Sequence, residues 1–406
     1  MRQIVETRQG TKVITDILEK SFDKTQIVYV KAGNVSLFRQ KYECIKCREI
    51  NDFHHANDAY LNIVVGNVYD TKFTSDPRNF IKEYRKNPQK NEYHMYKLFD
   101  YNVQRGDRVA WTASNGESMK VVKGTLKKNT PLVTFMSYEE HGGLYDQNII
   151  SAKDIKKVKG KGYLPIKSSD SRLNNTEKYG GYAKVSGAYF FVVEHTVKNV
   201  RIRTIEPMPC YLTKVLTTKE KIEDYCCNIL KYDSPVVKYE KIKMYSLIKV
   251  NGYPMYLTGR TGNQLIVSNG IQLVLSYDEA KYIKDLLKIN QEEFDQNRLE
   301  NLGINKFRNE KLYDTLNKNY TNEIYKKRPN SMGNKMIEWK NTFQNLSIKD
   351  QTEVLLQLIQ LGQKQNSGVN LEKLGASKKT GVSVVSKKIT DKESFELINK
   401  SITGLY

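Results

Sequence analysis

Hydrophobic positions near the N-terminus recur with helical spacing. In residues 1–25, apolar residues fall three and four positions apart, which predicts a helix that ends near Phe22. The run QIVYVK at 26–31 predicts a short strand. Further helices are predicted from Asn34 and from about Asn51. The predicted core-facing stripe of the last helix consists of Phe53, Ala56, Ala59, Tyr60 and Ile63.

Runs of β-branched and aromatic residues predict strands further along the chain. Three of them lie at 120–126, 131–138 and 188–197. From 242 to 276 such runs are separated by turn signals, which predicts an antiparallel meander. These signals are Asn251-Gly252, Thr261-Gly262 and Asn269-Gly270.

Helical periodicity returns over residues 277–365. Ser347 stands three positions before Asp350 at the start of an apolar-rich segment, a pattern typical of a helix cap, and Gly362 is the expected stop. Residues 381–389 predict a final strand or hairpin arm. Helices mixed with strands place the chain in the α+β or α/β class.

The overall charge narrows the range of partners. The chain of 406 residues has 66 Lys+Arg against 45 Asp+Glu, a net charge of +21, which favours a polyanion. No run of 18 apolar residues occurs and the first twenty residues are charged throughout, so we expect no membrane span and no secretory signal. Nucleic acid is therefore the preferred partner, with a merely basic soluble protein as the alternative.

The five cysteines do not form a recognisable framework. Cys44 and Cys47 have the spacing of half a zinc site, but the adjacent pair Cys226 and Cys227 has poor geometry for the other half. Packed or surface thiols in a reducing compartment are the expected interpretation.

The stretch REINDFHHANDAYLNIVVG (48–66) has the most distinctive chemistry. On a helix, His55 and Asp58 share a face and His54 points about 100° away. An imidazole that accepts a proton beside a carboxylate that holds a hard cation suits metal-dependent phosphodiester cleavage. A structural polar face on a packed helix is the competing interpretation.

Four blocks occur in an order and spacing that resemble one family: VETRQ (5–9), REINDFHHANDAYLNIVVG (48–66), KYGGY (178–182) and SITGLY (401–406). They resemble the C-terminal third of the type II CRISPR effector, an RNA-guided DNA endonuclease that acts in antiviral defence. The resemblance implies a partial RNase H-like (RuvC) domain over 1–137. A mixed β-rich and helical region that reads the short DNA motif beside the target, the PAM, would follow. Within it, 138–240 would be topoisomerase-like and 241–406 the C-terminal PAM-interacting domain.

The resemblance also implies roles for individual residues. His55 would be the general base, Asp58 a ligand of Mg²⁺ or Mn²⁺, and His54 a supporting neighbour. A loop after Gly142-Gly143 would hold a target-strand phosphate through Asp146, Gln147 and Asn148, with backbone N–H groups and amides acting where the family has a lysine. Residues that would read the PAM are Lys378, Lys379, Thr380, Ser383 and Ser386. No arginine occurs at 375–390, so a GG motif is not expected.

The implied partners are target DNA with its PAM, guide RNA and tracrRNA in a prokaryotic cytoplasm. The family's site also uses an Asp and a Glu from earlier segments, so we expect this chain to act with a missing N-terminal part of the same effector and to be inactive alone. Two alternatives stay open: a DNA-binding module without cleavage activity, and an independent metal hydrolase.

Overall fold

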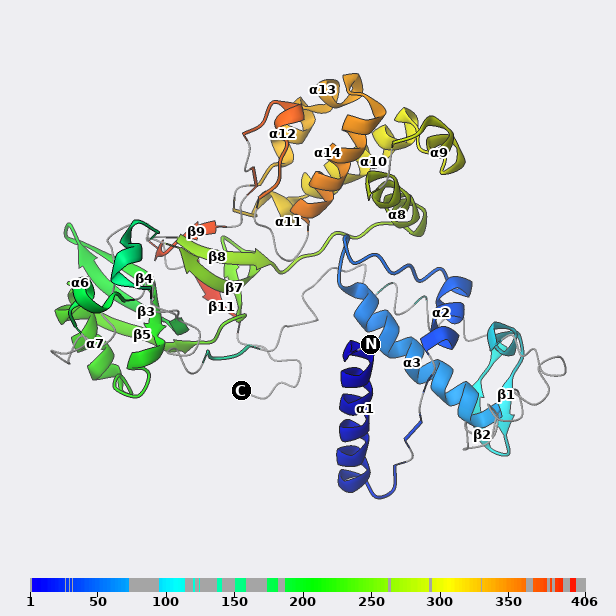
Figure 1. The fold of residues 1–406 in the computed structure, drawn as a ribbon, viewed down its shortest axis with the longest axis horizontal. Coiled ribbons are helices and arrows are strands. Elements are labelled where there is room, and N and C mark those ends of the chain that lie inside the picture. The colour runs from blue at the N-terminus through cyan, green and yellow to red at the C-terminus, as the bar shows by residue number, and fades with distance from the viewer. Residues whose placement is uncertain are drawn as a thin grey trace. The chain divides into compact units, whose positions relative to one another are not determined.

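The computed structural model describes most of the chain and separates it into two compact units. The described residues are 2–25, 27–28, 30, 32–72, 95–113, 120, 124, 137–140, 150–157, 174–181, 187–261, 264–291, 294–329, 331–362, 368–377, 380–381, 384–389 and 395–398. The first unit comprises Met1–Lys128 and Val274–Lys284, and the second comprises Asn129–Leu273 and Asp285–Tyr406. Figure 1 shows the helices and strands of both units.

The first unit is built mainly from helices. Its elements are α1 (Arg2–Ser21), α2 (Ala32–Lys41), α3 (Phe53–Lys72), the 3₁₀ helix η1 (Met95–Asp100), and the strands β1 (Val103–Arg105) and β2 (Arg108–Trp111). An aromatic cluster of Phe38, Phe99 and Trp111 packs against the buried side of α3. The indole Nε1 of Trp111 donates to the carbonyl of Phe99 at 3.1 Å, so this buried polar group is satisfied.

Local sequence predicted these helices better than it predicted their buried sides. The helix predicted in residues 1–25 is confirmed by α1, and the helices predicted near Asn34 and Asn51 by α2 and α3. The apolar stripe predicted for α3 is only partly right: Tyr60 packs against the core, but Ile63 is 65% exposed and the core contains Leu61, Val65 and Val68. Apolar residues lie on several sides of α3, and only packing decides which side is buried.

Two strand predictions in this part of the chain are also wrong at the residues that the structure describes. Residues 27, 28 and 30 of QIVYVK are not in a strand. Lys120 and Gly124, the described residues of the run at 120–126, are helical. Short apolar runs do not distinguish a strand from a helix or a packed extended segment.

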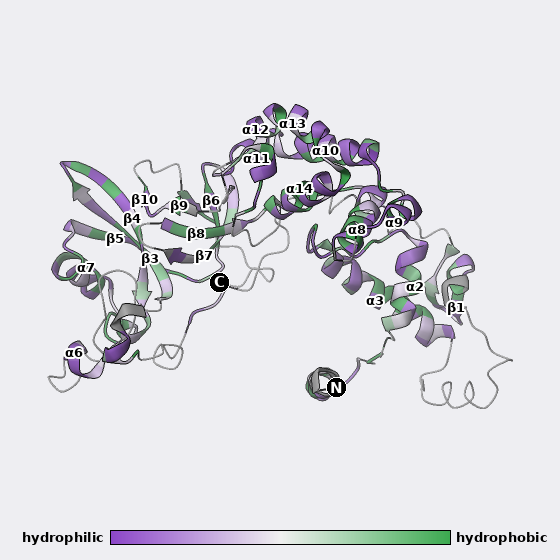
Figure 2. Cartoon of the chain, turned by 45° about the horizontal axis from the view of Figure 1, so that its top comes forward, coloured by the Kyte–Doolittle hydropathy of each residue, from purple (hydrophilic) through white to green (hydrophobic). Residues whose placement is uncertain are grey.

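The second unit contains a four-stranded antiparallel sheet in the order β10-β4-β3-β5. Its strands are β3 (Gly187–Val197), β4 (Val200–Pro209), β5 (Asp233–Ile242) and β10 (Lys388–Ile389). Figure 2 shows apolar and polar residues interspersed along β4, in which Thr204, Ile205 and Glu206 are buried in succession. The helix α7 (Lys219–Asn228) packs on one face around Phe191, Met208 and Ile222. The short elements η3 (Ala152–Lys157), α6 (Thr176–Tyr179) and η4 (Cys210–Leu212) also belong to this unit.

A five-stranded antiparallel sheet follows in the order β11-β6-β7-β8-β9. Its strands are β6 (Leu247–Val250), β7 (Tyr253–Thr261), β8 (Gln264–Asn269), β9 (Val384–Ser386) and β11 (Phe395–Leu397). The predicted meander is confirmed as β6–β7–β8. Asn251 and Gly252 both have positive φ, of 51° and 79°, which matches the tight turn expected between twisted strands.

Helices make up most of the chain between the second strand group and the C-terminal strands. They are α8 (Tyr277–Gln291), α9 (Gln296–Asn301), α10 (Lys306–Tyr320), α11 (Glu323–Lys326), α12 (Gly333–Glu338), α13 (Lys340–Asn345), α14 (Ile348–Leu361) and the 3₁₀ helix η5 (Glu372–Leu374). The Ser347 hydroxyl accepts from the Asp350 N–H at 3.1 Å, so the predicted cap is confirmed. Within the described part of the chain, no helix is long and apolar enough to cross a membrane.

Candidate functional site

The first turn of α3 separates the two adjacent histidines. The Asn51 side chain accepts from the Phe53 N–H at 3.0 Å, and the His55 N–H donates to the Asp52 carbonyl at 3.0 Å. These bonds satisfy amides that a helix start leaves without partners. Starting the helix at Phe53 places His54 toward the interior, 4% exposed, and leaves His55 at the surface.

His54 is held as a neutral, oriented ring. Its Nδ1 lies 3.1 Å from the Asn51 carbonyl, which can only accept, so Nδ1 is the donor. Burial lowers the pKa of His54, which keeps the ring neutral near pH 7. Its Nε2 is buried and has no hydrogen-bond partner. The two rings are 4.1 Å apart between centroids, so His54 supports one side of His55.

Asp58 lies one turn after His55 and is bound by two cations. Arg39 on α2 forms a close ion pair with one carboxylate oxygen, and Lys46 Nζ lies 2.9 Å from the other. Burial alone would raise the pKa of Asp58, but hydrogen bonds from Lys46 and Arg39 outweigh it and lower the pKa below the usual range. The carboxylate is therefore ionised, and both of its oxygens already have partners.

The donor atoms around α3 do not by themselves match the needs of Mg²⁺. Among the described residues, the only group of three His, Cys, Asp or Glu ligands that lie close together is Asp52, His54 and His55, with atoms within 4.8 Å of one another. That group offers two nitrogens and one carboxylate, whereas Mg²⁺ prefers six oxygens in octahedral geometry. Asp58 is not in the group. The described residues thus supply single ligands but no complete site for this ion.

Cys44 and Cys47 are not part of that group of close ligands among the described residues. Cys44 and Cys47 line a cavity of about 300 Å³ together with His54 and residues 274–277 and 280. The Cys47 thiol donates to the Glu49 carboxylate at 3.3 Å, and the Cys44 thiol lies 3.5 Å from the Tyr42 carbonyl. Burial, followed by Glu49, raises the pKa of Cys47 to about 12, so this thiol is protonated. The expectation of packed thiols fits these contacts.

The residues expected to contact DNA fall mostly outside the described part of the chain. Asp146, Gln147, Asn148, Lys378, Lys379 and Ser383 all lie outside it. Thr380 is 7% exposed and its hydroxyl donates to the Ser377 carbonyl at 2.6 Å. Ser386 ends β9 and is exposed.

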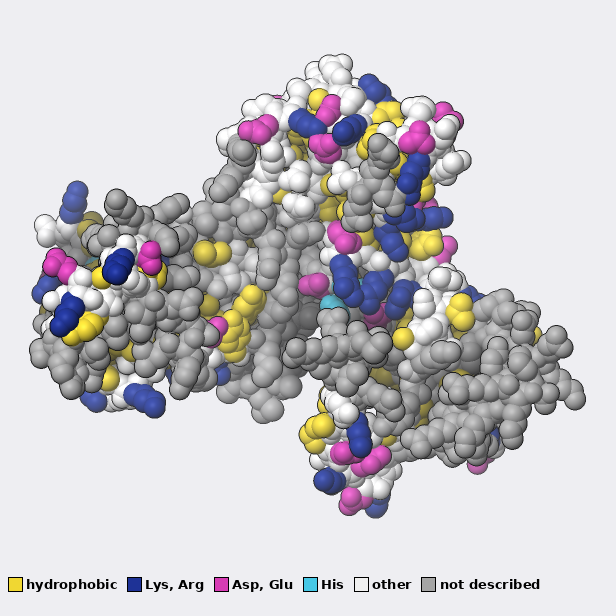
Figure 3. Space-filling view, in the orientation of Figure 1, with side chains coloured by type: hydrophobic (Ala, Val, Ile, Leu, Met, Phe, Trp, Pro, Cys, Tyr) yellow, Lys and Arg dark blue, Asp and Glu magenta, His cyan; other side chains and the backbone are white. Residues whose placement is uncertain are grey.

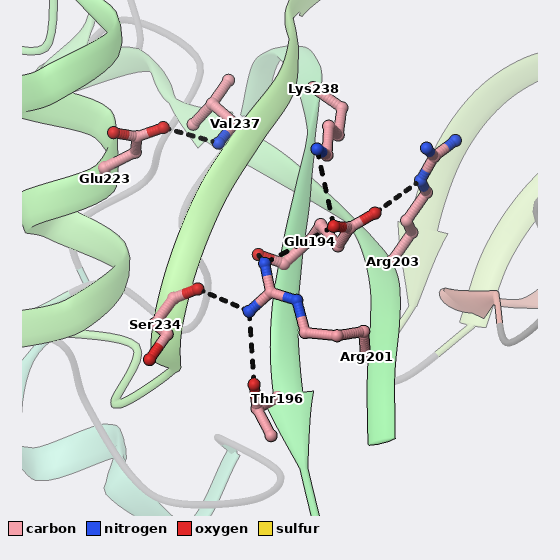
Figure 4. A network of polar contacts seen from close by, with 8 residues as sticks. All are labelled: Glu194, Thr196, Arg201, Arg203, Glu223, Ser234, Val237 and Lys238. Carbon is pink, nitrogen blue, oxygen red and sulfur yellow. Dashed lines mark hydrogen bonds and ion pairs between the residues drawn. The ribbon is translucent and has the colours of Figure 1, made fainter. Parts of the chain in front are cut away.

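Two positively charged surfaces emerge that sequence reasoning did not single out. On α8, Lys281, Lys284 and Lys288 are exposed at spacings of three and four residues, and Figure 3 shows Lys and Arg side chains over this helix. On the four-stranded sheet, Glu194 is surrounded by Arg201, Arg203 and Lys238 (Figure 4). The helical periodicity of the α8 lysines could have identified the first surface. Identifying the second surface requires the strand register, which pairs Glu194 with Arg203.

Comparison with known proteins gives matches along most of the chain. Residues 141–406 match the model for the PAM-interacting domain of CRISPR-associated endonuclease Cas9, and residues 8–126 match the model for the Cas9 RuvC domain. The chain is 25% identical over 334 residues to the CRISPR-associated endonuclease Cas9 of Streptococcus mutans, covering 72% of this chain and 24% of that protein. It is 30% identical over 227 residues to the corresponding protein of Listeria innocua, covering 48% of this chain and 16% of that protein. The matched regions thus amount to a quarter or less of each relative's length.

Proposed function

This chain belongs to the Cas9 family, and from that premise we propose that it works as the C-terminal portion of an RNA-guided DNA endonuclease. The observation that supports this most directly is the arrangement on α3, where exposed His55 and ionised Asp58 lie one turn apart within the RuvC-matching region. That is the placement needed for one side of a site that cleaves phosphodiester bonds.

The roles proposed for α3 follow from what surrounds each side chain. His55 accepts a proton from the attacking water, because it is exposed and its ring is supported by His54. Asp58 serves as a ligand of Mg²⁺ or Mn²⁺ once Arg39 and Lys46 no longer occupy its oxygens. The remaining ligands come from outside this chain, because the donor set around α3 does not suffice.

The exposed side of α1 is consistent with a larger assembly. Val13, Ile14 and Ile17 are each more than half exposed and lie on one side of this helix. In the proposed effector, the missing N-terminal part of the RuvC domain covers this stripe. We propose that the complete protein acts in the cytoplasm of a prokaryotic cell.

The second unit and helix α8 would bind nucleic acid in this proposal. The partners are the PAM-bearing duplex, the guide RNA and tracrRNA, and the α8 lysines bind phosphates. Asp146, Gln147 and Asn148 remain the proposed phosphate-holding loop. Lys378, Lys379, Ser383 and Ser386 remain the proposed PAM readers. Thr380, whose hydroxyl is bonded to Ser377, contributes through the turn rather than through its side chain.

A second function is supported by the ion pairs of Asp58. With both carboxylate oxygens bound by cations, the chain by itself would be a duplex-binding module without cleavage activity. This alternative shares the DNA partner of the first and differs only in chemistry.

One experiment separates the two functions. The chain is expressed in frame with the coding sequence upstream of Met1 in its genome, with the matching guide RNA, and is given plasmids that carry a target beside randomised bases. Guided cleavage that needs Mg²⁺ and is lost in His55→Ala and Asp58→Asn supports the nuclease. Guided or unguided binding without cleavage supports the binding module. Nicking by the 406-residue chain alone, lost in His55→Ala, would contradict the expectation that its site is incomplete.

A further inference from the structure

Residues 384–389 pass from one sheet of the second unit to the other. Ser386 is paired with Gln264 of β8, in the five-stranded sheet. Two residues later, Lys388 is paired with Thr204 of β4, in the four-stranded sheet. Lys387 lies at the crossing, and its carbonyl accepts from the Ile205 N–H at 3.0 Å.

The buried carboxylate of Glu206 contacts Lys387 where the segment crosses between the sheets. Glu206 on β4 is 2% exposed, and its Oε1 lies 2.5 Å from Nζ of Lys387, which is 8% exposed. Its Oε2 accepts from Nη1 of Arg260 on β7 at 2.6 Å, and the Tyr232 hydroxyl also donates to the Glu206 carboxylate. We refer to Glu206, Tyr232, Arg260 and Lys387 as the Glu206 cluster. It joins both sheets and the segment that runs between them.

The Glu206 cluster constrains the segment more sharply than apolar packing would. Charge-assisted hydrogen bonds are short and directional, so they fix where an ammonium group lies. A slip of one residue in this segment would turn the Lys387 side chain to the opposite face, away from Glu206. Removing one partner of a buried ion pair is costly because the remaining charge is left uncompensated.

We propose that Glu206 is a positioning residue for DNA reading: by anchoring Lys387 it fixes the register of residues 384–389 and so the placement of Ser386. This inference rests on the proposed function, in which this segment contacts the PAM. Ser386 is exposed and directly precedes the anchored residue, and exposed Lys388 directly follows it. Glu206 itself is buried and acts through Lys387 rather than by touching DNA.

The chain offers a matched control on the same sheet. Glu194 on β3 is also surrounded by cations, but Arg201 and Arg203 lie on β4 and Lys238 on β5 (Figure 4). Glu194→Gln therefore removes a comparable set of ion pairs without touching Lys387. The variants to compare are Glu206→Gln, Lys387→Met and Glu194→Gln in the full 406-residue chain.

The first measurement is amide hydrogen exchange of a peptide covering 384–389. We expect exchange there to speed up by about tenfold or more in Glu206→Gln and Lys387→Met, with β6 and α14 unchanged, as for a local opening. Glu194→Gln should leave this peptide at the wild-type rate. Wild-type exchange at 384–389 in Glu206→Gln and Lys387→Met, or equal acceleration in Glu194→Gln, would overturn the positioning role. If Glu206→Gln does not fold, Lys387→Met decides, because it leaves Glu206 paired with Arg260.

The second measurement is selection of bound duplexes from a library with randomised bases. We expect Glu206→Gln to lose sequence preference while its total binding in low salt stays near wild type, a change that mere destabilisation would not produce. Unchanged preference in Glu206→Gln would also overturn the proposal. If the wild-type chain itself shows no preference while exchange at 384–389 responds as expected, the anchoring stands and the PAM-reading function fails.

Discussion

The rings of His54 and His55 lie 4.1 Å apart, yet only the second faces solvent. Adjacent residues on a helix point about 100° apart, which allows His54 to be buried while His55 is exposed. One ring is therefore buried and the next one is open to solvent. This difference allows the two histidines to be distinguished by stability measurements.

His54→Ala should destabilise the first unit, whereas His55→Ala should not. The first change removes a buried ring and its bond to the Asn51 carbonyl, at a cost of about 2 kcal/mol in the free energy of unfolding. The second removes an exposed side chain, with an expected effect within about 0.5 kcal/mol. Urea unfolding in a Trp339→Phe background reports on this unit through Trp111, which is buried in its core. Equal destabilisation by the two changes would contradict the assignment.

The exposed lysines of α8 should bind phosphates. Replacing Lys281, Lys284 and Lys288 with Gln should weaken duplex binding and reduce the slope of log affinity against log salt by about 2.7, since each phosphate that is no longer neutralised lowers it by about 0.9. The matched control replaces three exposed lysines of α10, namely Lys306, Lys311 and Lys318. Glu310 and Asp314 lie beside Lys311 and Lys318, so we expect little change in slope. Fluorescence anisotropy across a salt series measures the duplex affinity of each triple variant and its salt dependence. Equal slopes for the two triple variants would contradict this prediction.

Glu194 should make stability depend on pH in the acid range. Burial alone would raise the pKa of Glu194, but the bond from Arg203 and the charge of Lys238 lower it. The pKa of Glu194 is lower in the folded state than its unfolded value of about 4.3. The ion pairs of this carboxylate therefore stabilise the fold above that pH, and their contribution is lost as the pH falls through the folded pKa. Urea unfolding followed by circular dichroism should therefore show a smaller loss of stability on acidification, from about pH 6 to about pH 3, in Glu194→Gln than in wild type. An identical loss would show that this carboxyl does not contribute.

The turn between β6 and β7 should require glycine at one position. Gly252 has φ of 79°, and a Cβ there would meet only the Lys327 side chain at 3.8 Å, so the penalty comes from the backbone. Gly252→Ala should cost about 1–2 kcal/mol. Gly259→Ala on β7, which lacks positive φ and would make ordinary contacts with Ile266 at 3.6 Å, is the control and should be close to neutral. Urea unfolding measures the stability of the two variants. An equal loss of stability in both would argue against the positive φ at Gly252 as the cause.

The features predicted correctly from sequence are those fixed by neighbours along the chain. The cap at Ser347 and the turn at Asn251-Gly252 both depend on residues a few positions apart. The buried side of α3 was predicted only in part because distant segments decide which apolar residues are covered. The ion pair of Arg39 with Asp58 spans 19 residues and that of Glu206 with Lys387 spans 181, and no local pattern reveals either.

The strand β10 has a consequence for synthesis and for engineering. It completes the sheet of β3, β4 and β5 from residues 388–389, so during synthesis β4 keeps an unpaired edge until these residues have been made. An exchange of segments with a relative at residue 240 would likewise separate Glu206 from its own Lys387. Chimaeras designed to alter DNA preference should therefore take the four-stranded and the five-stranded sheet from the same parent protein.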